Sequence, residues 1–181
     1  MIQVSDILGK DYDDIKDLII RTDFDEETLK SFSDAGINPP LTDAKLKKEI
    51  YFFEFKIERN KISFFENKVF EILFACDRQK TADIIQDLLN QNIFEFKFYT
   101  NKQIENTEWL NKDDDSEEGF LEWKFKRLEF DNSLVFDVNN LDMYSRITFH
   151  SEKLSIIIKN QIIDDEAVYL FELNQNLNKS F

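Results

Sequence analysis

The chain has 181 residues and a formal net charge of −14, from 37 acidic and 23 basic side chains. Its 42% hydrophobic content can build a core, which excludes bulk disorder. The three Gly, two Pro and single Cys exclude a collagen-like composition and a disulfide framework. No run approaches about 18 apolar residues, and the first residues lack the pattern of a secretory leader, so we expect a cytoplasmic protein.

The acidic residues concentrate toward both ends of the sequence. Residues 1–40 hold 10 acidic and 4 basic side chains, residues 41–100 hold 10 of each, and residues 101–181 hold 17 and 9. This charge repels nucleic acid and anionic membranes, whereas it attracts basic proteins. We therefore expect no nucleic-acid or membrane partner. The alternative reading is that the charge only keeps the protein in solution.

The first 37 residues predict two helices. In residues 11–21 the apolar side chains recur at spacings of three and four, at Tyr12, Ile15, Leu18 and Ile19. A second helix is predicted over residues 25–34, with Asp23 or Asp25 as its cap and Gly36 at its end. Its inward residues are Leu29 and Phe32. The prolines of residues 38–40 bar further helix, and we expect a junction there within one domain of residues 1–181.

From about residue 50 the apolar period changes to two, which is typical of strands. Residues 51–58 predict a strand with one wet face, and residues 59–61 predict a hairpin connection in which Asn60 is able to take a positive φ. The apolar run at residues 69–75 predicts an interior strand. The other elements expected before residue 100 are a strand at 62–65, a helix at 79–90 capped by Asp77 or Thr81, and a strand at 94–98.

Two pairs of adjacent phenylalanines interrupt this alternation, Phe52 with Phe53 and Phe64 with Phe65. Neighbouring strand residues point to opposite faces, so one member of each pair must be covered by a helix or presented to a partner. Aromatic rings beside carboxylates would suit a basic protein surface, because Arg and Lys can both pair and stack there.

Residues 101–118 predict a long exposed acidic loop, and residues 119–173 predict an antiparallel meander. The meander strands are expected at 121–125, 128–130, 134–138, 147–149, 154–158 and either 168–170 or 169–173, with a bulge near 126–127 and a turn at 131–133. The fold class is therefore α+β. We expect the N-terminal helices and the helix at 79–90 to cover one side of a twisted, mostly antiparallel sheet of about seven to nine strands, which could curl toward a half-barrel.

The sequence contains no recognisable catalytic or cofactor motif. His150 and Cys76, the only residues of their types, are the sole candidates for a nucleophilic dyad, and they cannot build a His/Cys zinc site. We expect a buried Cys76 and a surface His150. An EF-hand loop starting at Asp113 fails, because Glu118 replaces the required Gly and Lys124 the bidentate Glu. No catalytic residue, metal or cofactor is predicted.

The size, the acidity, the lack of catalytic motifs and the Asn-, Lys-, Ile- and Phe-rich composition resemble the immunity proteins of bacterial toxin systems such as contact-dependent growth inhibition. This resemblance of composition implies a non-enzymatic protein that neutralises a basic toxin domain, commonly a nuclease, by covering its active site. The expected partner-binding residues are carboxylates of the two helices and of the acidic loop, namely Asp13, Asp14, Asp17, Asp25, Glu26, Glu27, Asp113, Asp114, Asp115, Glu117 and Glu118.

Two other functions fit the same composition. One is an acidic nucleic-acid mimic, which would present carboxylates at the spacing of phosphates and compete with DNA for its target. The other is an enzyme that uses only carboxylates, with a divalent ion, for which the acidic loop at residues 113–118 is a candidate weak site.

Overall fold

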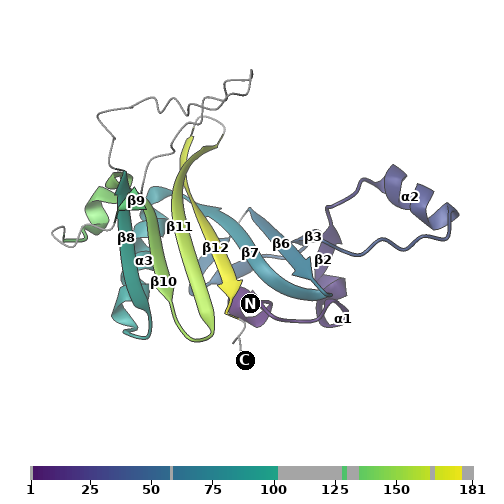
Figure 1. The fold of residues 1–181 in the computed structure, drawn as a ribbon, viewed down its shortest axis with the longest axis horizontal. Coiled ribbons are helices and arrows are strands. Elements are labelled where there is room, and N and C mark those ends of the chain that lie inside the picture. Colours follow the sequence, from purple (N-terminus) through teal and green to yellow (C-terminus); the bar gives the residue numbers. More distant parts are fainter. Residues whose placement is uncertain (1, 58, 102–127, 130–134, 164–165, 177–181) are drawn as a thin grey trace, which may run out of the picture.

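A computed structural model describes residues 2–57, 59–101, 128–129, 135–163 and 166–176. Its centre is a nine-stranded sheet in the order β2-β3-β6-β7-β12-β11-β10-β8-β9, with every neighbouring pair antiparallel (Figure 1). The strands are β2 (Ile19–Arg21), β3 (Asp43–Leu46), β6 (Asn60–Phe65), β7 (Lys68–Cys76), β8 (Glu95–Asn101), β9 (Leu128–Glu129), β10 (Tyr144–His150), β11 (Leu154–Ile163) and β12 (Glu166–Gln175).

A second, three-stranded sheet has the order β1-β4-β5, in which β1 is parallel to β4. Its strands are β1 (Ile2–Gln3), β4 (Ile50–Phe52) and β5 (Phe55–Ile57). The helices are α1 (Tyr12–Ile15), α2 (Glu26–Asp34) and α3 (Arg78–Asn90), with 3₁₀ turns η1 (Val4–Asp6), η2 (Lys16–Leu18) and η3 (Val138–Met143). The predicted α+β class and mainly antiparallel sheet are confirmed, and the large sheet is not closed into a barrel.

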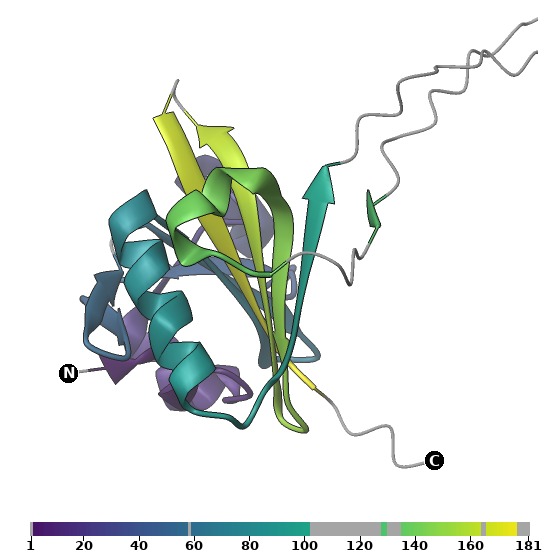
Figure 2. The same ribbon diagram turned by 90° about the vertical axis from the view of Figure 1, so that its left-hand side faces the viewer.

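One face of the large sheet is covered by α3, η3 and the small sheet (Figure 2). The Asp77 side chain caps α3 by accepting a hydrogen bond from the Lys80 amide at 2.8 Å, so the first of the two expected caps is the one used. The apolar stripe of α3 is buried at Ile84, Ile85 and Leu88. This stripe fixes the helix against the sheet.

Aromatic rings fill the middle of the covered face. The rings of Phe74 on β7 and Phe171 on β12 stack with centroids 4.9 Å apart, and Phe52 of the small sheet lies 5.5 Å from Phe74. All three side chains are buried. Burial of such a side chain contributes about 1.5–3 kcal/mol, so these contacts anchor the small sheet on the large one.

We call the opposite side of the large sheet the open face, because no helix that the structure describes packs against it. Its side chains alternate with the core residues and are mostly half-buried. Leu73, Ile157 and Leu170 supply apolar surface there, and Lys159 pairs with Glu172 at 2.5 Å. The open face is therefore a mixed apolar and charged surface.

The predicted helix over residues 11–21 is wrong in its second half. Only Tyr12–Ile15 is α-helical, and Ile19–Arg21 forms strand β2, with Ile19 opposite Leu46 of β3. Ile15 and Ile19 are both buried, as a helical spacing of four would also require. The β-branched pair Ile19-Ile20 is better accommodated in a strand, and pairing with β3 decides the conformation.

The second predicted helix exists, but its placement on the sheet is not confirmed. Asp25, rather than Asp23, caps α2, and Gly36 ends it with a φ of +70°. None of the α2 residues is buried, and the helix stands away from the sheet at the far right of Figure 1. Among the described helices of eight or more residues, only α3 lies on the sheet.

Residues 51–58 are not one strand. Phe53 has a φ of 55°, and the chain reverses there to form the β4–β5 hairpin. The predicted turn at residues 59–61 is also wrong, because Asn60 belongs to β6 and its side chain accepts a hydrogen bond from the Leu46 amide at 2.9 Å. The β6–β7 hairpin instead turns at Glu66 and Asn67, which both have positive φ.

The C-terminal part follows the predicted meander from β10 to β12. For the last strand, the sequence left open whether the inward residues begin at 168 or at 169. The buried residues are Tyr169, Phe171 and Leu173. The strand expected at 134–138 is wrong for its described residues, since 135–137 are irregular and η3 begins at Val138. The expected loop at 102–118, strand at 121–125, bulge at 126–127 and turn at 131–133 lie outside the described residues.

Candidate partner-binding surface

The carboxylates predicted near the first helix are all exposed. Asp13 and Asp14 occupy the first turn of α1, where negative charge is favourable, and Asp17 lies in η2. The Lys16 ammonium pairs with Asp13 at 3.2 Å, and this hydrogen bond raises the pKa of Lys16. An exposed pair of this kind contributes little to stability, so these carboxylates are accessible to a partner.

A second set of predicted carboxylates begins α2. Asp25 accepts a hydrogen bond from the Thr28 amide at 2.7 Å, which lowers the pKa of Asp25. Glu26 and Glu27 follow in the first turn, and all three residues are exposed. The structure places this set on a different element from Asp13, while the remaining predicted set, residues 113–118, lies outside the described residues.

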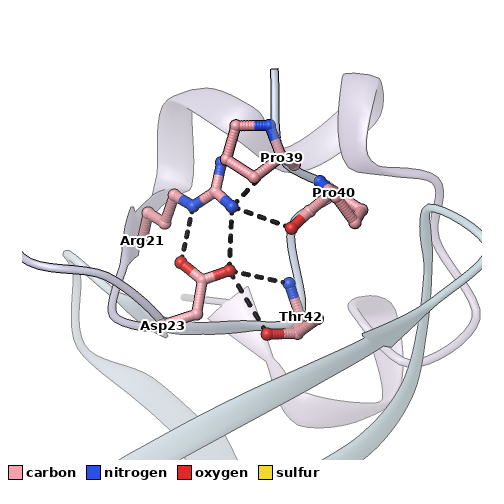
Figure 3. A network of polar contacts seen from close by, with 5 residues as sticks. All are labelled: Arg21, Asp23, Pro39, Pro40 and Thr42. Atoms are coloured by element: carbon pink, nitrogen blue, oxygen red, sulfur yellow. Dashed lines mark hydrogen bonds and ion pairs between the residues drawn. The ribbon is translucent and has the colours of Figure 1, made fainter. Parts of the chain in front are cut away.

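A partly buried ion pair holds the base of the segment that carries α2 (Figure 3). The Arg21 guanidinium donates to both carboxylate oxygens of Asp23, at 2.5 and 3.0 Å, and to the carbonyl oxygens of Pro39 and Pro40, at 3.2 and 2.8 Å. Asp23 also accepts from the amide and the hydroxyl of Thr42. We call these five residues the clasp and residues 24–38 the arm.

The clasp is well satisfied electrostatically. The Asp23 side chain is only 4% exposed, and burial alone would raise its pKa. The hydrogen bonds from Arg21 and Thr42 outweigh that effect and keep the pKa of Asp23 below its usual range. A bidentate pair of this kind is directional as well as strong, so the two ends of the arm are fixed relative to each other.

Within the arm, a small apolar cluster supports α2. The rings of Phe24 and Phe32 meet edge to face at 5.3 Å, and Leu29, three residues before Phe32 in α2, is half-buried. The Arg21 guanidinium lies over the Phe24 ring, 5.3 Å from its centroid. Leu29 and Phe32, which were expected to face inward, are half-buried but do not join the core.

The α1 carboxylates lie next to the β6–β7 hairpin. The Tyr12 amide donates to the Asn67 carbonyl at 2.8 Å, and the Val69 amide donates to the Lys10 carbonyl at 3.0 Å. The Gly9 amide also donates to the Val69 carbonyl at 2.8 Å, and its φ of +82° is a conformation that glycine adopts readily. This hairpin is therefore part of the same acidic end of the molecule.

The hairpin exposes two aromatic rings. Phe64 is 5% exposed, whereas Phe65 is 62% exposed and Phe70 is 39% exposed. The rings of Phe65 and Phe70 are 6.4 Å apart in an edge-to-face arrangement. Of the two alternatives expected for the Phe64-Phe65 pair, cover by a helix does not apply, since no described helix covers Phe65. Sequence reasoning did not identify Phe70, because its outward position results from a bulge between β6 and β7.

The structure does not bring Cys76 and His150 together. Cys76 is buried on β7, where burial raises the pKa of its thiol to about 12. His150 is exposed on β10, and strands β12 and β11 lie between β7 and β10. The two side chains also point to opposite faces of the sheet, because Cys76 lies on the covered face and His150 alternates with the buried Phe149. They therefore cannot form a dyad.

Other signs of a small-molecule or metal site are few. A shallow hollow between η1 and α1 is lined by Ile7, Lys10, Asp14 and Ile15, among others. In the described ranges, no three His, Cys, Asp or Glu side chains are grouped so that they could hold a metal ion. None of the helices found there has the length and apolarity needed to cross a membrane. Comparison of the chain with protein-family models, curated proteins and solved structures finds no match.

Proposed function

We propose that this chain is a non-enzymatic acidic binding protein that neutralises a basic protein partner, in the manner of an immunity protein that covers a toxin domain. The observation that carries the proposal is the arm. Its helix buries no residue, yet the clasp, in which only the Asp23 side chain is buried, holds the arm in place with Asp25, Glu26 and Glu27 exposed at the start of α2. Most helices of globular proteins are stabilised by packing, so an ordered helix without it is well suited to contact another molecule.

The charge of the chain supports a basic partner. The net charge of −14 accelerates encounter with a positive protein. The arm carboxylates extend the negative surface beyond the sheet, and the α1 carboxylates add a second group. Covering a partner's active site requires a projecting or concave surface, and the arm projects (Figure 1).

The proposal is tested by retrieving the partner from a lysate with the wild-type chain and with a variant in which arm carboxylates are replaced by lysine. The full chain is immobilised, incubated with lysate of its source cell and of cells co-expressing the neighbouring gene, and eluted by salt. We expect one basic protein that is released by about 0.5 M salt, because screening is then strong. The Glu26→Lys/Glu27→Lys variant should retain on the order of 10-fold less of it. Glu152→Lys, an exposed change in the β10–β11 connection, is the matched control.

Three results would count against the proposal. They are retention of no basic protein, equal retention by the arm variant, and loss of retention by the control variant. Competition by DNA for a retained protein that does not cleave nucleic acid would favour the nucleic-acid mimic instead. Thermal stabilisation of the chain by Mg²⁺ or Ca²⁺ would favour the carboxylate enzyme.

A further inference from the structure

Two carboxylates and two aromatic rings gather on the open face where β3, β6 and β7 lie side by side. Asp43 of β3 is opposite Ser63 of β6, which is opposite Glu71 of β7. Phe65 lies two residues beyond Ser63 on the same side of β6, and its ring contacts that of Phe70. We call these five residues the β6–β7 cluster.

The two carboxylates of this cluster compete for one hydrogen bond from the Ser63 hydroxyl. The Ser63 hydroxyl lies 3.2 Å from Asp43 Oδ1 and 3.4 Å from Glu71 Oε2, but a hydroxyl donates only one hydrogen bond. Ser63 is buried, so water is largely excluded from its oxygen. One carboxylate is always left without this donor.

The surrounding cations do not compensate the two carboxylates equally. Lys61 pairs with Asp43 at 3.1 Å. Within the described part of the chain, Glu71 has no ion-pair partner, and its carboxylate accepts only the shared hydrogen bond from Ser63. Glu71 is half-buried, so its charge is only partly hydrated. It can therefore accept further donors from outside the chain.

We propose that the β6–β7 cluster is a receptor for an arginine side chain of the basic partner. The guanidinium donates to the Glu71 carboxylate while its plane lies against one of the two rings, which stand edge to face. This inference rests on the proposed function for the existence of that partner. The pairing of an uncompensated carboxylate with exposed rings favours arginine over lysine, because guanidinium is planar, donates in a fork and stacks on aromatic rings.

A second copy of this chain is a poorer occupant of the cluster. Two chains with a charge of −14 each repel one another. The cluster itself has two carboxylates, and Lys61 pairs with only one of them, so the local charge is also negative. The cluster is complementary to a cation and not to itself.

The test uses short peptides, so it does not require the partner to be known. The ¹⁵N-labelled full chain is titrated with acetyl-Gly-Arg-Gly-amide, and amide shifts are followed by NMR. We expect saturable shifts centred on the residues 63–71 hairpin with millimolar affinity. The matching lysine peptide should bind at least about 3-fold more weakly, and the neutral citrulline peptide should cause no shifts there.

Variants of exposed side chains assign the binding to the cluster. Phe65→Ala and Glu71→Gln should each weaken the arginine peptide at least about 5-fold. Ile93→Ala and Glu152→Gln, which change an exposed apolar residue and an exposed acid elsewhere, should leave it unchanged. Unaltered thermal unfolding of each variant shows that the fold is retained.

The inference is overturned if arginine and lysine peptides shift the same dispersed set of acidic residues, or if Phe65→Ala leaves affinity unchanged. Its failure can be told apart from failure of the proposed function. Retrieval of a basic partner that is insensitive to Phe65→Ala would reject the cluster alone. Peptide binding at the cluster without any retrievable partner would reject the proposed function alone.

Discussion

Helices α2 and α3 begin in the same way and end in different environments. Each is capped by an aspartate whose carboxylate accepts from the amide three residues later, Asp25 for α2 and Asp77 for α3. Each also has apolar residues at helical spacing. However, α3 buries Thr81, Ile84, Ile85 and Leu88 against the sheet, whereas no residue of α2 is buried. Local signals specify that a helix forms, and the surroundings determine whether it belongs to the core.

The two helices are held in place in different ways. Packing orders α3, so its stability is tied to that of the whole sheet. The clasp of Arg21 and Asp23 orders the arm from its base, and α2 depends mainly on local contacts. We therefore expect α3 to open with global unfolding and the arm to open separately, at a lower free energy.

The largest expected effect comes from truncating one apolar side chain in α3, compared with the same kind of change in α2. Ile85→Ala in α3 removes a fully buried side chain and should lower the free energy of unfolding by about 2–5 kcal/mol. Leu29→Ala in α2 should lower it by less than about 1 kcal/mol, since Leu29 is only half-buried. Urea denaturation followed by circular dichroism measures both values. Equal losses would show that α2 belongs to the cooperative core.

Breaking the clasp should release the arm and leave the sheet folded. Asp23→Asn replaces the charge that pairs with Arg21, a change worth about 1–3 kcal/mol for a charged hydrogen bond. Amides of α2 should then exchange with deuterium on the order of 10-fold faster or more, while those of β7 keep their wild-type rates. Faster exchange in β7 as well would mean that the clasp supports the whole fold.

The same clasp predicts a pH dependence of arm opening. The pKa of Asp23 is lowered by folding, so its contribution is complete above the ordinary value of 3.8 and is lost as the pH falls through the lowered pKa. The arm should therefore open on acidification below about pH 4. The Thr42 amide resonance reports this change by NMR. In Asp23→Asn the acid-dependent shift of this resonance should disappear, and its persistence would assign the effect to another group.

The caps allow a smaller, matched comparison. Asp77→Ala and Asp25→Ala each remove one capping hydrogen bond, worth about 1 kcal/mol. Asp77→Ala should appear in global unfolding, whereas Asp25→Ala should appear only as faster exchange of arm amides. A global loss from Asp25→Ala would again contradict the separation of the two regions.

The smallest expected effect concerns Cys76 at the end of β7. Since the pKa of its thiol is raised to about 12 and the side chain is buried, iodoacetamide at pH 8 should not modify the folded protein. Arm opening by Asp23→Asn should not change this protection, because the arm does not cover β7. Modification should begin only in urea that unfolds the sheet.

The sequence predicted well the strands whose apolar alternation is regular. Strands β10, β11 and β12 follow it, and so does the interior strand β7. The failures lie where period two and period four coincide, as at Ile15 and Ile19, which are buried in either conformation. The β4–β5 turn was also missed, because Phe53 takes a positive φ that its residue type does not indicate.

Less of the candidate surface could be predicted. The exposure of Phe65 followed from its position beside Phe64, but the grouping of Asp43, Ser63 and Glu71 depends on the register of three strands. The clasp likewise joins Arg21 to residues 39–42 across the whole arm. Spacing along the chain does not encode either contact, since both result from tertiary pairing.

The strand order also has a consequence for the time course of folding during synthesis. Central strand β7 pairs on one side with β6, a sequence neighbour, and on the other with β12, whose first residue is Glu166. Until β12 has left the ribosome, one edge of β7 has no partner in the sheet, and an unpaired edge invites aggregation. At about 5–20 residues per second, the roughly 90 intervening residues expose that edge for about 5–20 seconds. The acidity of the nascent N-terminal segment opposes self-association during this interval.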